Sequence, residues 1–413
     1  MKNSTKNPRL IQLDILRGIA ILLVLGRHPV LPHEQSGSLN AVATLWHRFG
    51  WTGVDLFFVL SGFLVGGLLF QELRARGTLD VGRFLIRRGF KIWPSYYLFL
   101  AVFAALRLLT GAQGADAWDL LPNLLNVQNY FGSPRVHTWS LAVEEHFYLV
   151  LPLVLVAIIG RRPAASGRIA ALPAIPILSV CLVVACTALR WQVAVEPSYS
   201  HDQLLFPTHL RIDALFFGVL IAYVYHFHES VIGRLAGHRG LLVATGLALV
   251  APMAMVPVDH SVFVGSLGFA MLYVGYGCLL VAIVTTPLDY GRAGRWLQSA
   301  PARALAFVGM FSYPVYLWHI EVGIALNRVL ARWVALGPDA LALRWVSGMS
   351  AFVVLSVVMG VVMGRLVERP ALAMRDRLFP ARTDRLAATR PHTSGSLAPS
   401  VGIGAAPATA PCA

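Results

Sequence analysis

The chain has 413 residues, of which 57% are hydrophobic and only 13% charged, and its formal net charge is +14. Soluble domains carry about 25% charged residues, so this composition excludes an ordinary soluble enzyme and indicates a polytopic membrane protein. Positive charge on such a protein reports topology more often than nucleic-acid binding, and we expect no nucleic-acid partner. The four cysteines form no pattern of disulfide or metal-ligand spacing, so we expect no metal site.

Ten segments are long and apolar enough to be predicted as membrane-spanning helices. They are residues 10–30, 53–71, 92–110, 143–160, 172–190, 209–227, 240–257, 262–286, 304–327 and 343–366. With the N-terminus inside, 24 of the 34 Lys and Arg residues fall in inside segments and nine in outside segments, which is the bias of the positive-inside rule. The sequence therefore predicts an all-α bundle of about ten transmembrane helices, multi-pass in the cell membrane, with both termini in the cytoplasm.

The domain organisation predicted from composition is simple. Residues 1–9 form a cytoplasmic segment, residues 10–370 a transmembrane domain, and residues 371–413 a cytoplasmic tail. The tail is rich in Ala, Pro, Ser and Thr, so we expect it to be disordered. Asp14 and Arg17 interrupt the first apolar run, and we therefore interpret this run as a retained span rather than a signal peptide.

The first span carries an arginine and a histidine in the stretch "RGIAILLVLGRH". Eleven residues turn about 1100° in a helix, so Arg17 and His28 lie about 20° apart on one face and about 16 Å apart along the axis. Asp14 is within reach of an ion pair with Arg17. Charged residues within a span face the bundle interior or a wet cavity. The alternative is a structural Asp–Arg pair with an interfacial histidine.

Two further groups follow in the second and third spans. Asp55 stands near the outer end of "GVDLFFVLSGFLVGG", whose Ser and Gly residues permit close helix packing. The stretch "RFLIRRGFKIWP" places Arg83, Arg87 and Lys91 on one helical stripe with Arg88 beside it. This cluster fits three alternatives, namely ordinary positive-inside charge, a phosphate-binding site, and contact with anionic lipid headgroups.

Three later stretches place polar side chains at membrane depth. In "HTWSLAVEEHFY", Ser140, Glu144 and Tyr148 share one helical face beneath Trp139, and at least one of the adjacent carboxylates of Glu144 and Glu145 should face the interior. Arg211 and Asp213 open the sixth span in "RIDALFFG". The stretch "SYPVYLWHIE" holds Tyr313, Tyr316, His319 and Glu321, with Pro314 predicted to kink the ninth span.

Taken together, these stretches resemble acyltransferase family 3, whose members are integral-membrane O-acyltransferases. The resemblance covers about residues 10–370 and rests on Arg17 and His28, "GVDLFFVLSGFL", "RRGFKIWP", "WSLAVEEHFY", "RIDALFFG", "SYPVYLWH" and "VERP". It implies transfer of an acyl group, most often acetyl, from cytoplasmic acyl-CoA to a sugar hydroxyl of a glycan, glycolipid or secondary metabolite. No permanently bound cofactor is implied. Many members carry a further soluble domain, and this chain is expected to act without one.

The resemblance also implies roles for individual residues. Arg17 and His28 match a pair thought to be essential, and Arg87 and Arg88 match a motif thought to meet the acyl donor. We assign the candidate residues as follows: catalytic His28, Arg17, Glu144, Asp55 and His319; donor-binding Arg83, Arg87, Arg88 and Lys91; acceptor-binding Trp139, Ser140, Tyr148, Arg211 and Tyr313.

In the predicted mechanism His28 is the general base for the acceptor hydroxyl, and Asp55, Glu144 or Glu321 orients it. Arg17 stabilises negative charge on the donor or on the developing oxyanion. Direct transfer and an acyl-enzyme on Ser61 or Ser140 are both left open. The chief alternative function is a transporter or flippase of a glycolipid or small anion. A membrane sensor or scaffold and an unrelated type of membrane-bound acyltransferase are further alternatives.

Overall fold

The computed structural model describes residues 11–28, 38–110, 117–160, 174–196, 199–256, 261–288, 291–330 and 341–380. In this part of the chain the structure is helical throughout and has no strand, as predicted. The predicted cytoplasmic segment 1–9 and residues 381–413 of the predicted tail lie outside the described residues.

The helices follow one another with short connections. In chain order they are α1 (Ile11–Arg27), α2 (Ser38–Gly50), α3 (Gly53–Arg76), α4 (Val81–Leu109), η1 (Ala117–Leu120), α5 (Leu121–Leu124), α6 (Gln128–Phe131), η2 (Val136–Thr138), α7 (Trp139–Ile159), α9 (Ala174–Ala194), α10 (His201–Leu205), η3 (Thr208–Leu210), α11 (Ile212–Phe227), α12 (Glu229–Gly237), α13 (Arg239–Val250), α14 (Pro252–Met255), η4 (Val264–Gly268), α15 (Phe269–Val284), α16 (Gly291–Leu297), α17 (Ala300–Met310), α18 (Ser312–Leu330), α19 (Leu341–Met363), η7 (Gly364–Glu368) and α20 (Arg369–Leu378).

Six helical segments of the described chain are long and apolar enough to cross a membrane, and a seventh is formed if α11 and α12, bent by 103°, are one span. All ten predicted spans coincide with helices. Several, such as α1 with 17 residues, are shorter than a full span. The count of ten and the cytoplasmic placement of both termini stay predictions.

The predicted span 304–327 is not one helix. It is divided into α17 and α18 between Met310 and Ser312. Pro314 lacks the N–H that would bond to the carbonyl of residue 310, so a continuous helix loses a hydrogen bond at this point. Residues 371–378, expected to begin a disordered tail, form most of α20. The tail prediction is therefore wrong for these residues, which continue the last long helix.

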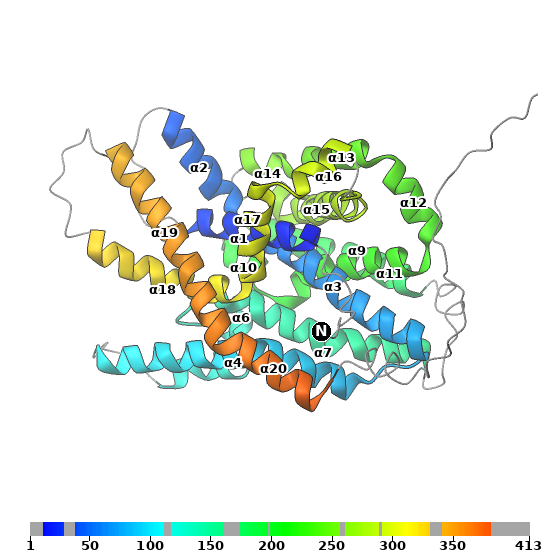
Figure 1. Cartoon of the computed structure of the whole chain (residues 1–413), viewed down its shortest axis with the longest axis horizontal. Helices are drawn as coiled ribbons and strands as arrows, with labels where there is room; N and C mark the ends of the chain where they lie inside the picture. The colour runs from blue at the N-terminus through cyan, green and yellow to red at the C-terminus, as the bar shows by residue number, and fades with distance from the viewer. Residues whose placement is uncertain are drawn as a thin grey trace, which may run out of the picture.

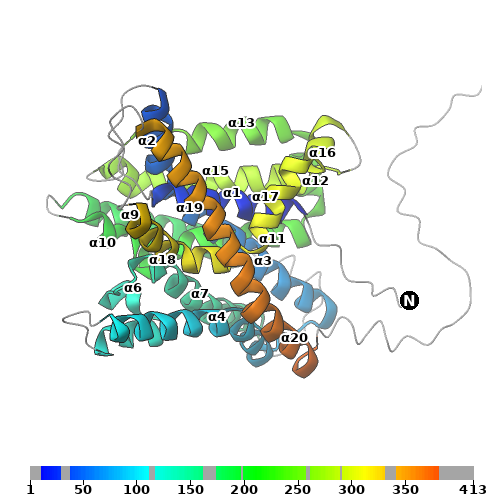
Figure 2. The same ribbon diagram turned by 60° about the vertical axis from the view of Figure 1, so that its left-hand side comes forward.

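α1 lies in the middle of the bundle, with α4 and α7 on one side and α13 on the opposite side (Figures 1 and 2). It contacts α2, α3, α15, α17 and α18. We call the end of the bundle near Arg27 the outer end, because the predicted topology places it outside, and the opposite end the inner end. This central position gives one helix, α1, access to side chains from most of the bundle.

Close packing of α3 against α11 depends on small residues. A Cβ on Gly62 would lie 1.9 Å from the carbonyl oxygen of Leu215, and a Cβ on Gly218 would lie 2.3 Å from that of Val59. No larger residue fits at this crossing without moving the backbones apart. The small residues of the second span therefore act in packing, and α3 is held at the depth where its Ser61 reaches the centre of the bundle.

Candidate active site

Two neighbouring cavities lie inside the bundle. The inner cavity has a volume of about 130 Å³ and the outer cavity about 370 Å³. The polar residues that line the inner cavity come from five helices and are Arg17, Ser61, Arg88, Lys91, Ser140, Glu144, Glu145, Tyr148, Ser312, Tyr313 and Tyr316. Those that line the outer cavity are Arg27, His28, Trp51, Arg135, His137, Trp139, Asp202 and Tyr316.

Glu144 is the hydrogen-bonding centre of the inner cavity. Ser61 Oγ donates to Glu144 Oε1 at 2.9 Å, and the hydroxyl of Tyr148 donates to Oε2 at 2.6 Å. The guanidinium of Arg88 lies over the Tyr148 ring at 5.3 Å. Glu145 also lines the cavity and accepts from Trp93 Nε1 at 3.2 Å. The prediction that a carboxylate of this pair faces the interior is confirmed for both.

Three of the predicted donor-binding cations contact the C-terminal segment from η7 to the residues just after α20. Arg83 donates to the carbonyl of Pro380, and Lys91 forms an ion pair with Glu368. Arg87 contacts Asp376 at 3.4 Å and donates to a backbone carbonyl beside it. The predicted stripe on α4 is thus present, and it faces the segment around α20. Arg88 is off the stripe and points into the inner cavity.

Three histidines meet near the outer cavity. The ring centroids of His28 and His319 lie 5.2 Å apart, and those of His319 and His137 lie 5.3 Å apart. His319 is fully buried and its Nδ1 lies 2.6 Å from the carbonyl oxygen of Tyr316, so that Nδ1 carries the proton. Its Nε2 has no hydrogen-bond partner among the described residues. His28 is half-buried and lines the cavity.

A shared wall separates the two cavities. Val54 and Tyr316 line both of them. The hydroxyl of Tyr316 donates to the carbonyl of His137 at 2.5 Å and lies 2.6 Å from Ser140 Oγ, from which it accepts. The sequence placed Arg17 and His28 on one face of the first span, and they could therefore have lined one common cavity. Instead, Arg17 lines the inner cavity and His28 the outer one, because Tyr316 of α18 inserts between them.

The other predicted site residues divide into two groups. Tyr313 lines the inner cavity and donates to the carbonyl of Ile92 at 3.0 Å, and Trp139 lines the outer cavity. Asp55 and Arg211 instead pair with each other at 2.7 Å, each with 1% of its side chain exposed, and line neither cavity. Asp55 and Arg211 therefore form a structural ion pair in the core. Their predicted roles in catalysis and acceptor binding stay predictions without support from this geometry.

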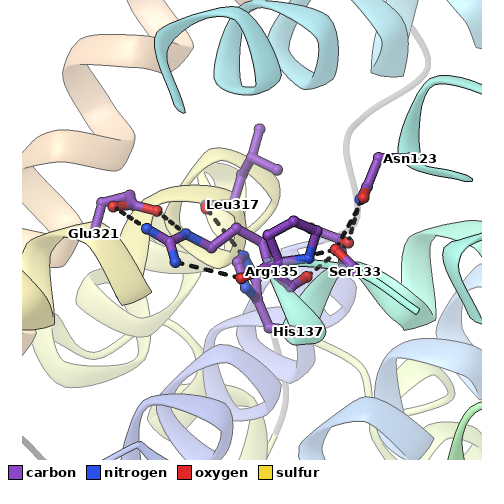
Figure 3. Close-up of polar contacts among 8 residues, drawn as sticks. Asn123, Ser133, Arg135, His137, Leu317 and Glu321 are labelled. Carbon is purple, nitrogen blue, oxygen red and sulfur yellow. Dashed lines mark hydrogen bonds and ion pairs between the residues drawn. The ribbon is translucent and has the colours of Figure 1, made fainter. Parts of the chain in front are cut away.

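Arg135 and His137 were not among the predicted residues. Arg135 forms two hydrogen bonds to the carboxylate of Glu321, and His137 Nε2 lies 3.2 Å from the carbonyl oxygen of Leu317 (Figure 3). Glu321, predicted as one possible partner of His28, is therefore engaged by Arg135. His137 stands at the start of the stretch "HTWSLAVEEHFY", so the polar content of that stretch was a signal for it.

Comparison with known proteins identifies the family. A family model described as an acyltransferase domain matches residues 10–363. The chain belongs to acyltransferase family 3. It is similar to the putative peptidoglycan O-acetyltransferase YrhL of Bacillus subtilis (strain 168), with 29% identity over 345 residues, which are 78% of this chain and 50% of that protein. It is also similar to the O-acetyltransferase OatA of Staphylococcus aureus (strain NCTC 8325 / PS 47), with 23% identity over 335 residues, 76% of this chain and 51% of that protein.

The family 3 chain spans about half the length of these curated relatives. No solved structure matches it. Membership is consistent with the geometry, because several polar residues of the resembling stretches line the cavities, with Arg17, Arg88 and Glu144 in the inner cavity and His28 in the outer one.

Proposed function

We propose that the protein is an O-acyltransferase of the cell membrane that moves an acetyl group from acetyl-CoA to a sugar hydroxyl. The observation that carries this proposal is the pair of cavities with one shared wall. The inner cavity is lined by Arg17, Arg88 and Lys91, and the outer cavity holds His28. Cationic side chains suit the phosphates of a CoA donor, and an imidazole suits the activation of a hydroxyl.

In the proposed reaction the donor is anchored at the inner end and its thioester arm extends toward the wall. His28 accepts the proton of the acceptor hydroxyl as the oxygen attacks the thioester carbonyl carbon. The carbon–sulfur bond breaks, and the CoA thiolate takes up the proton from His28. The ring of His319 packs against that of His28 at a centroid distance of 5.2 Å and limits its orientation. Arg17 acts on the donor, since it is about 16 Å from His28 along the axis of α1.

Peptidoglycan is the acceptor named for one relative, and a cell-surface glycan is accordingly the acceptor class we propose. A sugar hydroxyl at the outer end can enter the outer cavity without crossing the membrane core. This arrangement favours an acyltransferase over a transporter, because a transporter would have to carry the whole solute past the wall.

The test of the proposed function is release of free thiol from acetyl-CoA by the purified protein in the presence of a chitin-type oligosaccharide. His28→Ala is expected to lower acceptor-dependent release at least about 100-fold, the lower end of the usual contribution of a general base. His238→Ala, which removes an exposed histidine of the inner loop, is the matched control and should retain activity. Normal turnover in His28→Ala would remove His28 from the mechanism.

A further inference from the structure

A third and larger cavity opens on the side of the bundle. It has a volume of about 1170 Å³ and lies between the C-terminal halves of α4, α18 and α19. Most of its lining is apolar, including Leu106, Trp318, Val322, Val358 and Val362. Leu106, Val358 and Val362 each leave more than a third of the side chain exposed, so the groove is open toward the surrounding lipid. We call this feature the lateral groove.

The outer end of the lateral groove is basic. Arg107, Arg135 and Arg328 line it, and among the described residues Glu321 is its one lining carboxylate. Glu321 is engaged by Arg135, and Arg107 pairs at 3.0 Å with Asp119, which is 42% exposed. Arg328 is exposed and has no hydrogen bond or ion pair to the described residues. The groove therefore combines an apolar trough with an outer rim that complements a negative group.

The lateral groove adjoins the outer cavity. Pro134 and Arg135 line both. The guanidinium of Arg135 is fixed by both oxygens of Glu321 (Figure 3). It lies 4.1 Å from the centroid of the Phe103 ring, and the carbonyl of Arg135 accepts from Thr138 Oγ1 at 2.9 Å. Pro134 and Arg135 therefore stand between the two spaces, and His28 lines the outer cavity on the other side of them.

We propose that the lateral groove binds the acceptor, and that the acceptor is a saccharide linked through phosphate to a membrane lipid. The hydrocarbon chain fills the apolar trough, the phosphate lies at the rim near Arg328 and Arg107, and the sugar passes over Pro134 and Arg135 to His28. This assignment rests on the proposed function and names its substrate class. An apolar chain alone would leave the basic rim unexplained, and a soluble glycan would leave the trough unexplained.

The binding test does not depend on activity. The purified protein in phosphatidylcholine vesicles is irradiated with a polyprenyl phosphate that carries a diazirine in its chain, and labelled peptides are mapped. We expect label concentrated on residues 322–329 and 355–362. Ala325→Trp and Val358→Trp, which place an indole in the groove, should lower it at least about fivefold. Val184→Trp, on a similarly exposed apolar face of α9, is the control and should leave labelling unchanged.

The competing lipids give the decisive outcome. Unlabelled polyprenyl phosphate should displace the label, whereas phosphatidylglycerol at the same concentration should not. Equal displacement by phosphatidylglycerol, or label spread over α9 as strongly as over α18 and α19, would overturn the proposal.

A second arm compares acceptors. Acetyl transfer from radiolabelled acetyl-CoA is measured to a polyprenyl-diphosphate-linked sugar and to the water-soluble oligosaccharide. In Val358→Trp the ratio of lipid-linked to soluble transfer should fall about tenfold, and an unchanged ratio would overturn the proposal. If the unmodified protein transfers to neither acceptor, the proposed function fails, and the labelling result still decides whether the groove binds the lipid.

Discussion

Arg88 offers the sharpest test of how the donor binds. It is the one member of the basic cluster on α4 that lies off the stripe facing α20, and its guanidinium is in the inner cavity against the ring of Tyr148. Arg87, its neighbour in the chain, already contacts Asp376 and a backbone carbonyl of the C-terminal segment. Replacing either arginine by Gln removes one positive charge. A comparison of the two variants therefore separates the contribution of the inner cavity from that of the stripe that faces α20.

The expected magnitudes differ because the two guanidinium groups have different partners to lose. A hydrogen bond to a charged group contributes about 1.5–3 kcal/mol, so Arg88→Gln should raise the dissociation constant for CoA roughly 10- to 150-fold. Arg87→Gln loses a contact with a carboxylate that is 55% exposed. Such surface pairs are worth at most about 1 kcal/mol. Because Arg87 does not line the inner cavity, we expect Arg87→Gln to change the dissociation constant for CoA less than about fivefold.

The assay is calorimetric titration of CoA into the protein in lipid nanodiscs, with the KM for acetyl-CoA measured by thiol release. Arg88→Lys keeps the charge but not the two-pronged geometry and should fall between the native protein and Arg88→Gln. Arg234→Gln, an exposed cation of α12, controls for general attraction of the anionic donor. A larger loss of CoA affinity in Arg87→Gln than in Arg88→Gln would refute this reasoning. The donor phosphates would then bind to the stripe of Arg83, Arg87 and Lys91, where α20 lies in this structure.

Two further predictions concern the core and the wall. Asp55→Asn leaves the buried cation of Arg211 without a counter-ion and should destabilise the protein by about 3–5 kcal/mol, whereas Asp119→Asn at an exposed pair should cost less than about 1 kcal/mol. Equal melting temperatures of the two variants in detergent would contradict this difference. Tyr316→Phe removes the hydroxyl that closes the wall, so the rate of thiol release from acetyl-CoA without acceptor should rise. A rate no greater than that of the native protein would show that this hydroxyl does not keep the wall closed.

The features that follow from helical periodicity were predictable from the sequence. Ser140, Glu144 and Tyr148 were expected on one face, and the structure confirms this through the hydrogen bond from Tyr148 to Glu144. The stripe of Arg83, Arg87 and Lys91 on α4 was equally visible. These patterns are local, because spacing along one helix fixes which side chains share a face.

The partners of those faces were not predictable, since they come from distant parts of the chain. Lys91 pairs with Glu368, and Tyr316 contacts Ser140; the partners are 277 and 176 positions apart in the sequence. No pattern within α4 points to α20, and none within α1 points to the insertion of Tyr316 between Arg17 and His28. His137 lies in the short η2 turn, where no helical period marks one side chain as inward-facing.

The shared wall resolves a difficulty in the proposed reaction. The donor is a multiply charged molecule, and a charged group within the membrane core costs about 2.5–3.5 kcal/mol on insertion scales. With the cations in the inner cavity, the phosphates stay at the inner end and only the uncharged thioester has to pass Val54 and Tyr316. Opening the wall breaks the two hydrogen bonds of the Tyr316 hydroxyl, at a net cost of about 1–3 kcal/mol. An open state of that energy is populated roughly once in 5 to once in 150 molecules, which is frequent enough for turnover and rare enough to keep water from the thioester when no acceptor is bound.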